Sequence, residues 1–383
     1  MLHIVPAIFG ADGVFGGGER YAFELARHMA GEVETMLLSF GPRERRERLG
    51  NLEVRVIGNP WYVRGNRGNP FALSMLSYLR GADVVHCYQR HTLATSVAAL
   101  ACRALRRRVF VTDLGGGGWD ISAFLSTDNW FDGHLHLSEY SRRYFGHQDK
   151  AFARVILGGV DTEKFSPGSA SASDCVDQSA GNCVGRSTTH GIAAQSSGFD
   201  SVVYAGRILP HKGIDNLIVA MTPEMELKII GRVADESYLA DLHRMAAGKR
   251  VTFQHDLDDA GLIQAYRGAL CVVLPSVYRT MYGVEYQVPE LLGQTLLEGM
   301  ACGRPVICTR VASMPEIVED GVCGFIVAPN DPVELAGRIG WLREHPIEAA
   351  AMGAAARQRM LEKFTWPQVV RRCLEFYGNN RGS

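Results

Sequence analysis

Three features that would each name a class of protein are missing from this sequence. No apolar run reaches the roughly 18 residues needed to cross a bilayer, so no transmembrane helix is expected. The formal net charge of −1 over 383 residues provides no general basic character, which argues against nucleic-acid binding. No strand-like run is followed by G-x-G-x-x-G and, about 20 residues later, an acid, which disfavours a dehydrogenase.

Cysteine and histidine also lack the spacing that would indicate a site. The nine cysteines are scattered and include no C-x-x-C pair, and neither residue type shows zinc-ligand spacing, so no zinc site is expected. Several cysteines lie in apolar segments, where free cysteine behaves as a small hydrophobe. The N-terminal residues MLHIVPAIFGADG lack the marks of a signal peptide. These observations favour a reduced, cytoplasmic setting.

Short β-rich runs alternate with helical stretches along nearly the whole chain. Alternation of this kind predicts parallel sheets with helices on both faces, and the length is large for one compact core, which suggests two domains. The expected strands are LHIVPA, ETMLLSF, EVRVIG, DVVHCY, RVFVTDL, GHLHLS and ARVILGG in the first half, and SVVYAG, ELKIIG, VTFQHD, LCVVLPS, PVICT and GFIVAP in the second.

A segment of different composition separates the two halves. Residues 167–200 are rich in Ser, Gly and Ala and have no hydrophobic period, so we interpret them as a linker enlarged by a flexible insertion, with a functional lid as the alternative. The predicted domains are residues 1–166 and 201–365, followed by a C-terminal segment, 366–383. Open α/β sheets bind ligands beyond the carboxyl ends of their strands, so two facing domains predict a cleft for a two-substrate transfer.

Two loops that follow strands favour an anion site. The strand SVVYAG ends at Gly206, and Arg207, Lys212 and a helix expected from Ile214 come directly after it. Cations beside a helix N-terminus suit a phosphate, although most such residues are merely solvated surface charges. After the first strand, glycines 16–18 precede a helix, where backbone N–H groups can approach an anion.

The stretch PELLGQTLLEGMACGRPVI, residues 289–307, carries Glu290 and Glu298 on an apolar background. A buried acid is costly unless it finds partners. The T-x-x-E pattern from Thr295 predicts a helix capping box, with the helix ending at Gly303 and Pro305, and this accounts for Glu298. Glu290 is left without a structural explanation.

Other polar residues are ambiguous. The loop VTDLGGGGWDIS has four glycines and a tryptophan between Asp113 and Asp120, and it is either a mobile surface loop or a sugar-contacting one. His86 is expected in the core, and His91 is a weak candidate for contact with an acceptor. In HDLDD the D-x-D spacing suits a metal, but Asp258 is favoured as a helix N-cap. Arginine-rich stretches at 43–48 and 106–108 are interpreted as solvated faces, with peripheral membrane attachment as the alternative.

With these pieces in place, the sequence resembles the retaining glycosyltransferases of the GT-B fold, specifically glycosyltransferase family 4. The resemblance is carried by GGGERYAFELARHMA, YAGRILPHKGIDNLI, KIIGR and above all residues 289–331, where an E-x7-E pair, a G-x-P-V-I strand and a P-E-I-V-x-D-G helix occur in register. It implies an α/β protein with two doubly wound Rossmann-like domains facing across a cleft, the first binding the acceptor and the second the nucleotide sugar. It also implies transfer from a UDP- or GDP-linked sugar to a hydroxyl acceptor without a metal or other cofactor.

The resemblance implies a role for each matching residue. Arg207 and Lys212 would hold the donor diphosphate, Glu290 would contact the donor sugar, and Glu298 would hold the ribose hydroxyls. Asp113 stands where many members carry a histidine that contacts the donor sugar. The remaining donor-binding positions are the backbone of Thr295, Leu296 and Leu297, together with Gly17 and Gly18 from the first domain and Gly231 and His255 beside the base.

The resemblance also covers the end of the chain and the reaction. FTWPQVVRRCLEFY is similar to the last helices of the family, which cross back onto the first domain. Front-face attack, with the leaving phosphate accepting the acceptor's proton, is the implied route to retention. The acceptor would be a sugar, a lipid-linked sugar or a small molecule. The alternatives are a sugar-phosphate synthase, a phosphorylase, a nucleotide-sugar epimerase, or a nucleotide-sugar-binding module that has lost catalysis.

Overall fold

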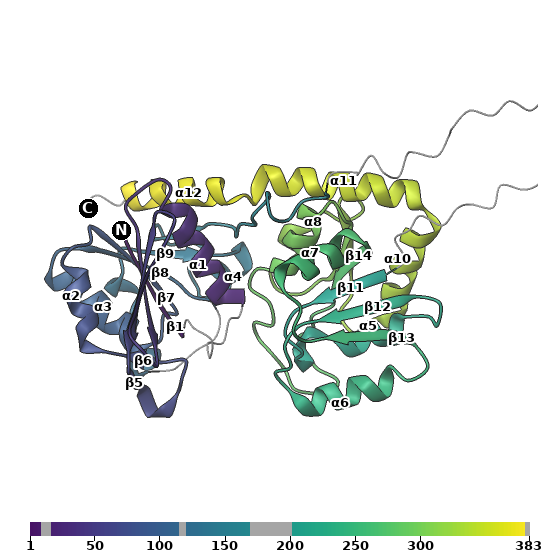
Figure 1. The fold of residues 1–383 in the computed structure, drawn as a ribbon, viewed down its shortest axis with the longest axis horizontal. Coiled ribbons are helices and arrows are strands. Elements are labelled where there is room, and N and C mark those ends of the chain that lie inside the picture. The colour runs from purple at the N-terminus through teal and green to yellow at the C-terminus, as the bar shows by residue number, and fades with distance from the viewer. Residues whose placement is uncertain (9–16, 115–119, 169–200, 380–383) are drawn as a thin grey trace, which may run out of the picture.

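The computed structural model of the chain describes residues 1–8, 17–114, 120–168 and 201–379, which form two lobes side by side (Figure 1). Two sequence expectations fall outside these residues: the glycine run with its tryptophan at 115–119, and all but the first residues of the 167–200 insertion. The predicted α/β class is confirmed, because each lobe is built on its own largely parallel sheet with helices packed against it.

The N-lobe holds the first sheet, whose strand order is β10-β9-β8-β7-β1-β2-β4-β3. All neighbours pair in parallel except β3, which is antiparallel to β4. The elements of this lobe are β1 (Leu2–Ile8), α1 (Gly17–Met29), β2 (Met36–Gly41), β3 (Arg45–Leu49), β4 (Leu52–Gly58), β5 (Trp61–Tyr62), β6 (Pro70–Phe71), α2 (Leu76–Leu79), β7 (Val84–Tyr88), α3 (Leu93–Ala104), β8 (Arg108–Thr112), β9 (Gly133–His136), α4 (Glu139–Tyr144) and β10 (Ala153–Val155).

The C-lobe holds a second sheet of parallel strands in the order β13-β12-β11-β14-β15-β16. Its elements are β11 (Ser201–Ala205), the short 3₁₀ helix η6 (Pro210–Lys212), α5 (Ile214–Ala220), β12 (Glu226–Ile230), α6 (Glu236–Met245), β13 (Arg250–Gln254), α7 (Asp259–Arg267), β14 (Ala269–Leu274), α8 (Gln294–Ala301), β15 (Val306–Thr309), α9 (Met314–Ile317), β16 (Gly324–Val327) and α10 (Pro332–Glu344). Each strand expected from the sequence is present, because uninterrupted apolar runs suit strands covered on both faces.

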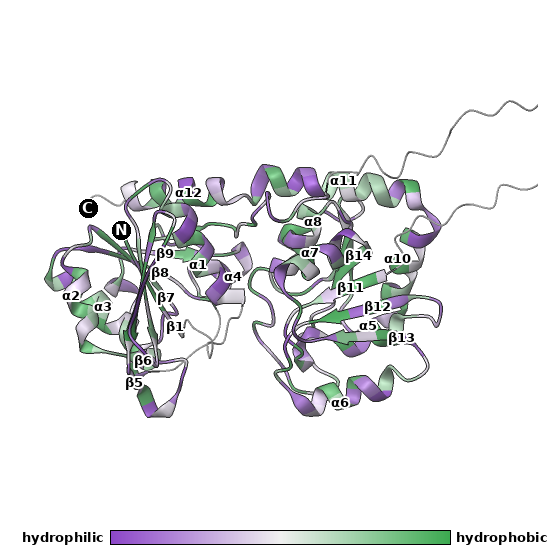
Figure 2. Ribbon diagram, viewed as in Figure 1, coloured by the Kyte–Doolittle hydropathy of each residue, from purple (hydrophilic) through white to green (hydrophobic). Residues whose placement is uncertain are grey.

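The two last helices run along one side of both lobes (Figure 1). Helix α11 (Pro346–Lys363) packs on α8 in the C-lobe, and α12 (Trp366–Asn379) packs on α1 in the N-lobe. The ring of Phe376 meets that of Phe110 with centroids 5.6 Å apart. The helices carry alternating hydrophobic and hydrophilic bands, whereas the central strands of the C-lobe are mainly hydrophobic (Figure 2). The C-terminal segment therefore completes the core of the first lobe.

The arginine-rich stretch 43–48 is more than the solvated face that the sequence suggested. Its residues from Arg45 onward form β3, an edge strand that pairs with β4. Arg45 lies 2.9 Å from Glu47, and Arg46 lies 3.3 Å from Glu53. Alternating charges on an edge strand discourage pairing with another chain, which explains a strand that hydrophobicity did not predict.

His86 lies in the core, as expected from the sequence. It is fully buried, its Nε2 lies 2.8 Å from Thr112 Oγ1, and its Nδ1 lies 2.8 Å from the hydroxyl of Tyr377 on α12. Burial lowers the pKa of His86 to about 3. A neutral imidazole therefore joins the last helix to the first sheet.

Two further buried histidines extend this pattern. Burial, reinforced by the charge of Arg90, lowers the pKa of His134 to about 3. Burial, reinforced by His147, also lowers the pKa of His136 to about 3. His136 Nε2 lies 3.0 Å from His147 Nδ1, so these rings form one hydrogen-bonded group inside the N-lobe.

We expect the N-lobe to be destabilised by acid well before its carboxylates titrate. The unfolded chain protonates His86, His134 and His136 near pH 6.5, while the folded state keeps them neutral down to about pH 3. Stability should be retained above pH 6.5 and lost below it, by up to about 1.4 kcal/mol per pH unit for each histidine. Urea unfolding between pH 7.5 and 5 measures this slope, and an unchanged slope in His134→Gln would contradict the explanation.

Candidate active site

A cavity of about 340 Å³ lies between the two lobes. Leu114 and Leu137 reach it from just beyond β8 and β9, and Gly206 from just beyond β11, so it lies at the carboxyl ends of strands in both sheets. Among the predicted site residues, those that line it are Gly17, Gly18, Arg207, Lys212, Glu290 and Thr295.

An ion pair between Lys212 and Glu290 forms one wall of this cavity. Lys212 ends the 3₁₀ helix η6, and the left-handed Gly213 (φ 65°) follows it. Lys212 Nζ lies 2.6 Å from Glu290 Oε2, and both side chains are almost fully buried. Burial raises the pKa of Glu290, but the charge and hydrogen bond of Lys212 outweigh it and hold that pKa below its usual value. Glu290 is therefore an anion at neutral pH.

The sequence left Glu290 without a structural role, and that interpretation is wrong. The backbone N–H of Gly293 donates to Glu290 Oε1 at 3.1 Å. Gly293 is the residue before α8 and adopts a left-handed conformation with φ 69°. Glu290 therefore binds the start of α8 through one carboxylate oxygen and binds Lys212 through the other.

The predicted capping box at Thr295 is also wrong. Helix α8 begins at Gln294 after the left-handed Gly293, and no side chain caps it. Thr295 lies inside the first turn, and its hydroxyl donates to the carbonyl of Ala205 at the end of β11, at 2.7 Å. The left-handed entry starts the helix earlier than a threonine cap would, so Thr295 fastens α8 to the neighbouring strand instead.

The three backbone groups expected to cap a phosphate are not equivalent. Thr295 lines the cavity, whereas Leu296 and Leu297 have fully buried side chains and are not among the described lining residues. The N–H of Leu296 donates to the carbonyl of Gly293 at 2.9 Å. Of these three residues, Thr295 alone is among the described residues that line the cavity, beside Gln294 at the start of α8.

Glu298 is buried and is not among the described residues that line the 340 Å³ cavity. It lines a small neighbouring pocket that shares Tyr21 and Gln294 with that cavity. The hydroxyl of Tyr266 donates to its Oε2 at 2.9 Å, and its Oε1 lies 3.7 Å from the guanidinium of Arg20 on α1. Burial raises the pKa of Glu298 above its usual value, against the opposing charge of Arg20. Neither Arg20 nor Tyr266 was predicted as a site residue, although Arg20 belongs to the GGGERYAFELARHMA motif.

Of the remaining predicted residues, Gly231 and His255 lie in the C-lobe and Asp113 lies in the N-lobe. Gly231 (φ 142°) is the residue after β12. It packs so closely against Gly206 that a Cβ at this position would lie 2.0 Å from the carbonyl oxygen of Gly206. His255 Nδ1 lies 3.0 Å from the carbonyl of Gly231, so these two residues are neighbours at the ends of β12 and β13. Asp113 is partly buried just beyond β8, and its neighbour Leu114, rather than Asp113, is among the described residues lining the cavity.

His211 and Tyr286 are among the cavity residues that the sequence reasoning missed. His211 precedes Lys212, and its ring lies against that of Tyr286 with centroids 4.6 Å apart. Burial, aided by the charges of Lys212 and Arg207, lowers the pKa of His211 to about 4. The imidazole is therefore neutral at physiological pH. A histidine in a loop beside a cationic residue carried no pattern that could have identified it.

Comparison with known protein families decides the identity of the two lobes. The model for Glycosyltransferase Family 4 matches residues 15–164, and that for Glycosyl transferases group 1 matches residues 188–359. The chain belongs to glycosyltransferase family 4. The first match covers most of the N-lobe and the second most of the C-lobe, so together they account for both sides of the cavity.

Relatives of known description cover most of this family 4 chain. Alpha-maltose-1-phosphate synthase of Mycobacterium tuberculosis is 26% identical over 341 residues, which cover 80% of this chain and 81% of the relative. The GDP-mannose-dependent alpha-(1-6)-phosphatidylinositol monomannoside mannosyltransferase of Mycolicibacterium smegmatis is 28% identical over 298 residues, which cover 74% of this chain and 73% of the relative.

Solved structures confirm the GT-B fold. HepE of Anabaena, in complex with UDP, matches with a TM-score of 0.72 at 18% identity and covers 99% of both chains. Sucrose-phosphate synthase from Thermosynechococcus elongatus matches with a TM-score of 0.70 at 18% identity and covers 99% of this chain and 98% of that one. The fold prediction, two Rossmann-like lobes facing across a cleft, is therefore correct.

Within this fold, hydrogen bonds at α4 also connect the two lobes. The carboxylate of Glu316 in the C-lobe accepts the backbone N–H groups of Glu139 and Tyr140 at 2.8 and 2.7 Å, at the start of α4. The hydroxyl of Tyr140 donates to the carbonyl of Gln287 at 2.7 Å. An anion at a helix start is electrostatically favourable, so α4 holds the lobes together beside the cavity.

Several acids outside the cavity have structural roles. Asp258 caps α7 by accepting the N–H of Gly261 at 2.8 Å, which confirms the predicted N-cap. Asp120 is buried and accepts from the N–H of Ser122 at 2.8 Å and the hydroxyl of Ser96 at 2.9 Å. His91 Nδ1 lies 3.2 Å from the hydroxyl of Ser122, beyond β7.

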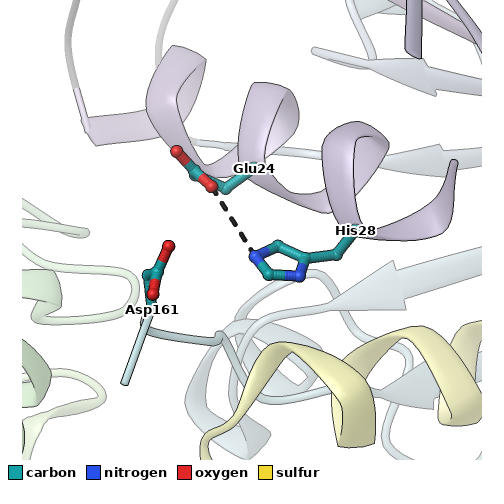
Figure 3. A group of neighbouring side chains, drawn as sticks. All are labelled: Glu24, His28 and Asp161. Carbon is teal, nitrogen blue, oxygen red and sulfur yellow. Dashed lines mark ion pairs between the residues drawn. The ribbon is translucent and has the colours of Figure 1, made fainter. Parts of the chain in front are cut away.

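One group of described side chains has a spacing that would suit metal ligands. Glu24 and His28 on α1 point toward Asp161, which lies on the segment leading out of the N-lobe (Figure 3). A guanidinium nitrogen of Arg27 lies 2.8 Å from Glu24 and 2.8 Å from Asp161. The positive charge that these carboxylates need is thus supplied by Arg27, and the group lies outside the cavity.

We expect Thr295→Val to cost about 1 kcal/mol of unfolding free energy, because it removes the hydrogen bond to Ala205 while preserving side-chain volume. Thr295→Ser should regain most of that loss. Urea denaturation measures both values. A wild-type stability for Thr295→Val would show that the contact with β11 contributes nothing.

Proposed function

We propose that this family 4 enzyme is a retaining glycosyltransferase that moves a sugar from a UDP- or GDP-linked donor to a hydroxyl acceptor. The observation that carries the proposal is the Lys212–Glu290 pair, 2.6 Å apart in the wall of the interlobe cavity. A buried ion pair is costly to keep, because two apolar side chains of similar volume in the same place are often as stabilising or more so. A reacting centre that develops charge of both signs is a sufficient reason for it.

The departure of a nucleoside diphosphate places negative charge on its phosphate oxygens. Arg207, Lys212 and the first turn of α8 at Thr295 line one side of the cavity and would stabilise that charge. Glu290, anionic and facing the same space, would lie beside the positive charge that develops on the sugar. We propose that these cations replace a divalent metal, so no cofactor is required.

Retention needs either a nucleophile from the protein or attack from the leaving-group face. Glu290 is the sole carboxylate among the described residues that line the cavity. Both of its oxygens are already held, by Lys212 and by the N–H of Gly293. This engagement argues against a nucleophilic role and supports front-face attack, with the leaving phosphate accepting the acceptor's proton.

The donor assignment draws on names of similar proteins as well as on geometry. HepE structures contain UDP-glucose, or UDP and glucose, and the mannosyltransferase relative is named as GDP-mannose-dependent. In the proposal Glu298 holds the ribose hydroxyls, Gly231 and His255 border the base, and Asp113 contributes from the N-lobe side. Gly17 and Gly18 would meet the diphosphate across the cavity.

We propose a sugar, a lipid-linked sugar or a small molecule as the acceptor, within glycan, glycolipid or natural-product synthesis. Two similar proteins are named as sugar-phosphate synthases, so a sugar phosphate is included among the acceptors to be tested. The seven described cysteines are free and buried, which supports a cytoplasmic setting, with peripheral contact of the N-lobe to a membrane as the alternative. No helix in the described ranges has the length and hydrophobicity to cross a bilayer.

The decisive experiment pairs donor screening with two variants. Nucleotide sugars that bind should raise the melting temperature, since ligand at 100 times its dissociation constant adds about 2.7 kcal/mol. With such a donor, Glu290→Gln and Lys212→Ala should each lower turnover at least tenfold, because one lost stabilising donor costs on the order of 3 kcal/mol of barrier. The product's anomeric configuration, read by NMR, reports retention.

Matched controls lie on the outside of the same lobe. Lys228 and Glu226 form a surface pair 4.0 Å apart on β12, so Lys228→Ala and Glu226→Gln should keep turnover near wild type. Full activity in both cavity variants would overturn the proposal. Conversion of donor without acceptor would instead indicate an epimerase, and donor binding without any conversion a binding module.

Transfer should continue in EDTA, because Arg207 and Lys212 supply the charge that a divalent metal would otherwise bring to the diphosphate. Initial rates with EDTA, and with added Mg²⁺ or Mn²⁺, measure this. A loss of rate in EDTA that metal restores would overturn metal-independent catalysis while leaving the family intact.

A further inference from the structure

Arg20 crosses from one lobe to the other. It lies in the first turn of α1, a helix on the side of the N-lobe that faces the C-lobe (Figure 1). One guanidinium nitrogen is 3.7 Å from Glu298 Oε1, and another is 3.2 Å from Asp259 Oδ1. The guanidinium also lies over the ring of Phe165, 5.6 Å from its centroid. Arg20 therefore contacts α7, α8 and Phe165, which lies on the chain segment that follows β10.

The groups that act on Glu298 come from three other elements. Tyr266 on α7 donates a hydrogen bond to Oε2, and Arg20 on α1 faces Oε1. Asp259, at the start of α7, acts on it with a like charge, and Lys164, which pairs with Asp259, acts with an opposite one. A carboxylate buried this completely requires such partners to stay ionised. Arg20 supplies the principal opposing charge, and it comes from the opposite lobe.

We propose that Arg20 is a positioning residue for donor binding, which keeps the Glu298 carboxylate oriented and charged so that it can accept both ribose hydroxyls. The inference rests on the proposed function, in which Glu298 meets the ribose. An ionised carboxylate is acceptor-only and can receive two hydroxyl groups, whereas a protonated one carries a donor proton and offers fewer acceptor positions. Affinity for the nucleoside is thereby tied to the approach of α1, and so to the closing of the lobes.

The direction of the pH effect follows from burial. Burial already raises the pKa of Glu298, and Arg20 opposes that rise. Without Arg20 the carboxyl group protonates at a higher pH, so donor affinity should fall as pH falls and recover as pH rises. A residue that only stabilised the fold would weaken binding by the same factor at every pH.

The experiment compares three variants of the full chain. Arg20→Met keeps an apolar stem against Phe165 without the charge, and Arg20→Lys returns a charge. Arg27→Met is the matched control, because Arg27 lies on the same helix but pairs with Glu24 and Asp161 instead of Glu298. Dissociation constants for UDP and GDP are measured by calorimetry from pH 6 to 9, and KM for the donor and kcat are measured alongside.

For Arg20→Met we expect a donor KM and a nucleotide Kd at least fivefold above wild type at pH 6.5, a deficit that shrinks toward pH 9, and a kcat within about twofold. Arg20→Lys should recover part of the affinity, and Arg27→Met should match wild type. Wild-type affinity in Arg20→Met, or an equal deficit at every pH, would overturn the inference.

A second route serves where Arg20→Met does not fold. Tyr266→Phe removes the hydrogen bond to Glu298 Oε2 without removing the ring, and should produce the same pH-dependent loss of nucleotide affinity. A pH-independent affinity in that variant would count against the inference. If the wild-type protein binds neither UDP nor GDP, the proposed function itself fails. If the wild-type protein binds nucleotide and neither Arg20→Met nor Tyr266→Phe changes the affinity, only the proposed role of Arg20 fails.

Discussion

A carboxylate withdrawn from water needs donors or cations, and the form of the cleft follows from how Glu290 and Glu298 obtain theirs. Glu290 finds its partners inside its own lobe, in Lys212 at 2.6 Å and the N–H of Gly293 at 3.1 Å. Glu298 is served by Tyr266 from its own lobe and by Arg20 from the other. The contacts of Glu290 are therefore independent of the relative position of the two lobes, whereas those of Glu298 depend on it.

In the proposed function, this difference separates the tasks of Glu290 and Glu298, two residues eight positions apart in one segment. The Lys212–Glu290 pair is preorganised: loop, helix start and acid fix one another before any ligand arrives. The surroundings of Glu298 depend on α1, which belongs to the lobe expected to hold the acceptor. Under the proposed function, reaction chemistry and nucleoside recognition would therefore respond differently to movement between the lobes, although α8 and the residues before it would carry both.

The strands and the main cavity residues could be predicted because their signals are local. Apolar runs indicated every parallel strand, and Arg207 and Lys212 were predictable because they directly follow one of them. β3 was missed because its alternating charges hide a strand pattern. The capping box was wrong because the left-handed conformation of Gly293, which the T-x-x-E pattern does not reveal, starts α8 earlier. Arg20 could not be assigned, since its partners are more than two hundred residues away, in another lobe.

The crossing of α12 has a consequence for how the molecule is made. Ribosomes deliver the N-lobe before the C-lobe, yet Phe110 and His86 are covered by Phe376 and Tyr377, which follow the whole C-lobe in the chain. The ring of Phe376 packs tightly against the sheet there, because a Cβ on Gly133 would lie 2.7 Å from it. The core of the N-lobe can therefore be completed only after the whole C-lobe has been synthesised.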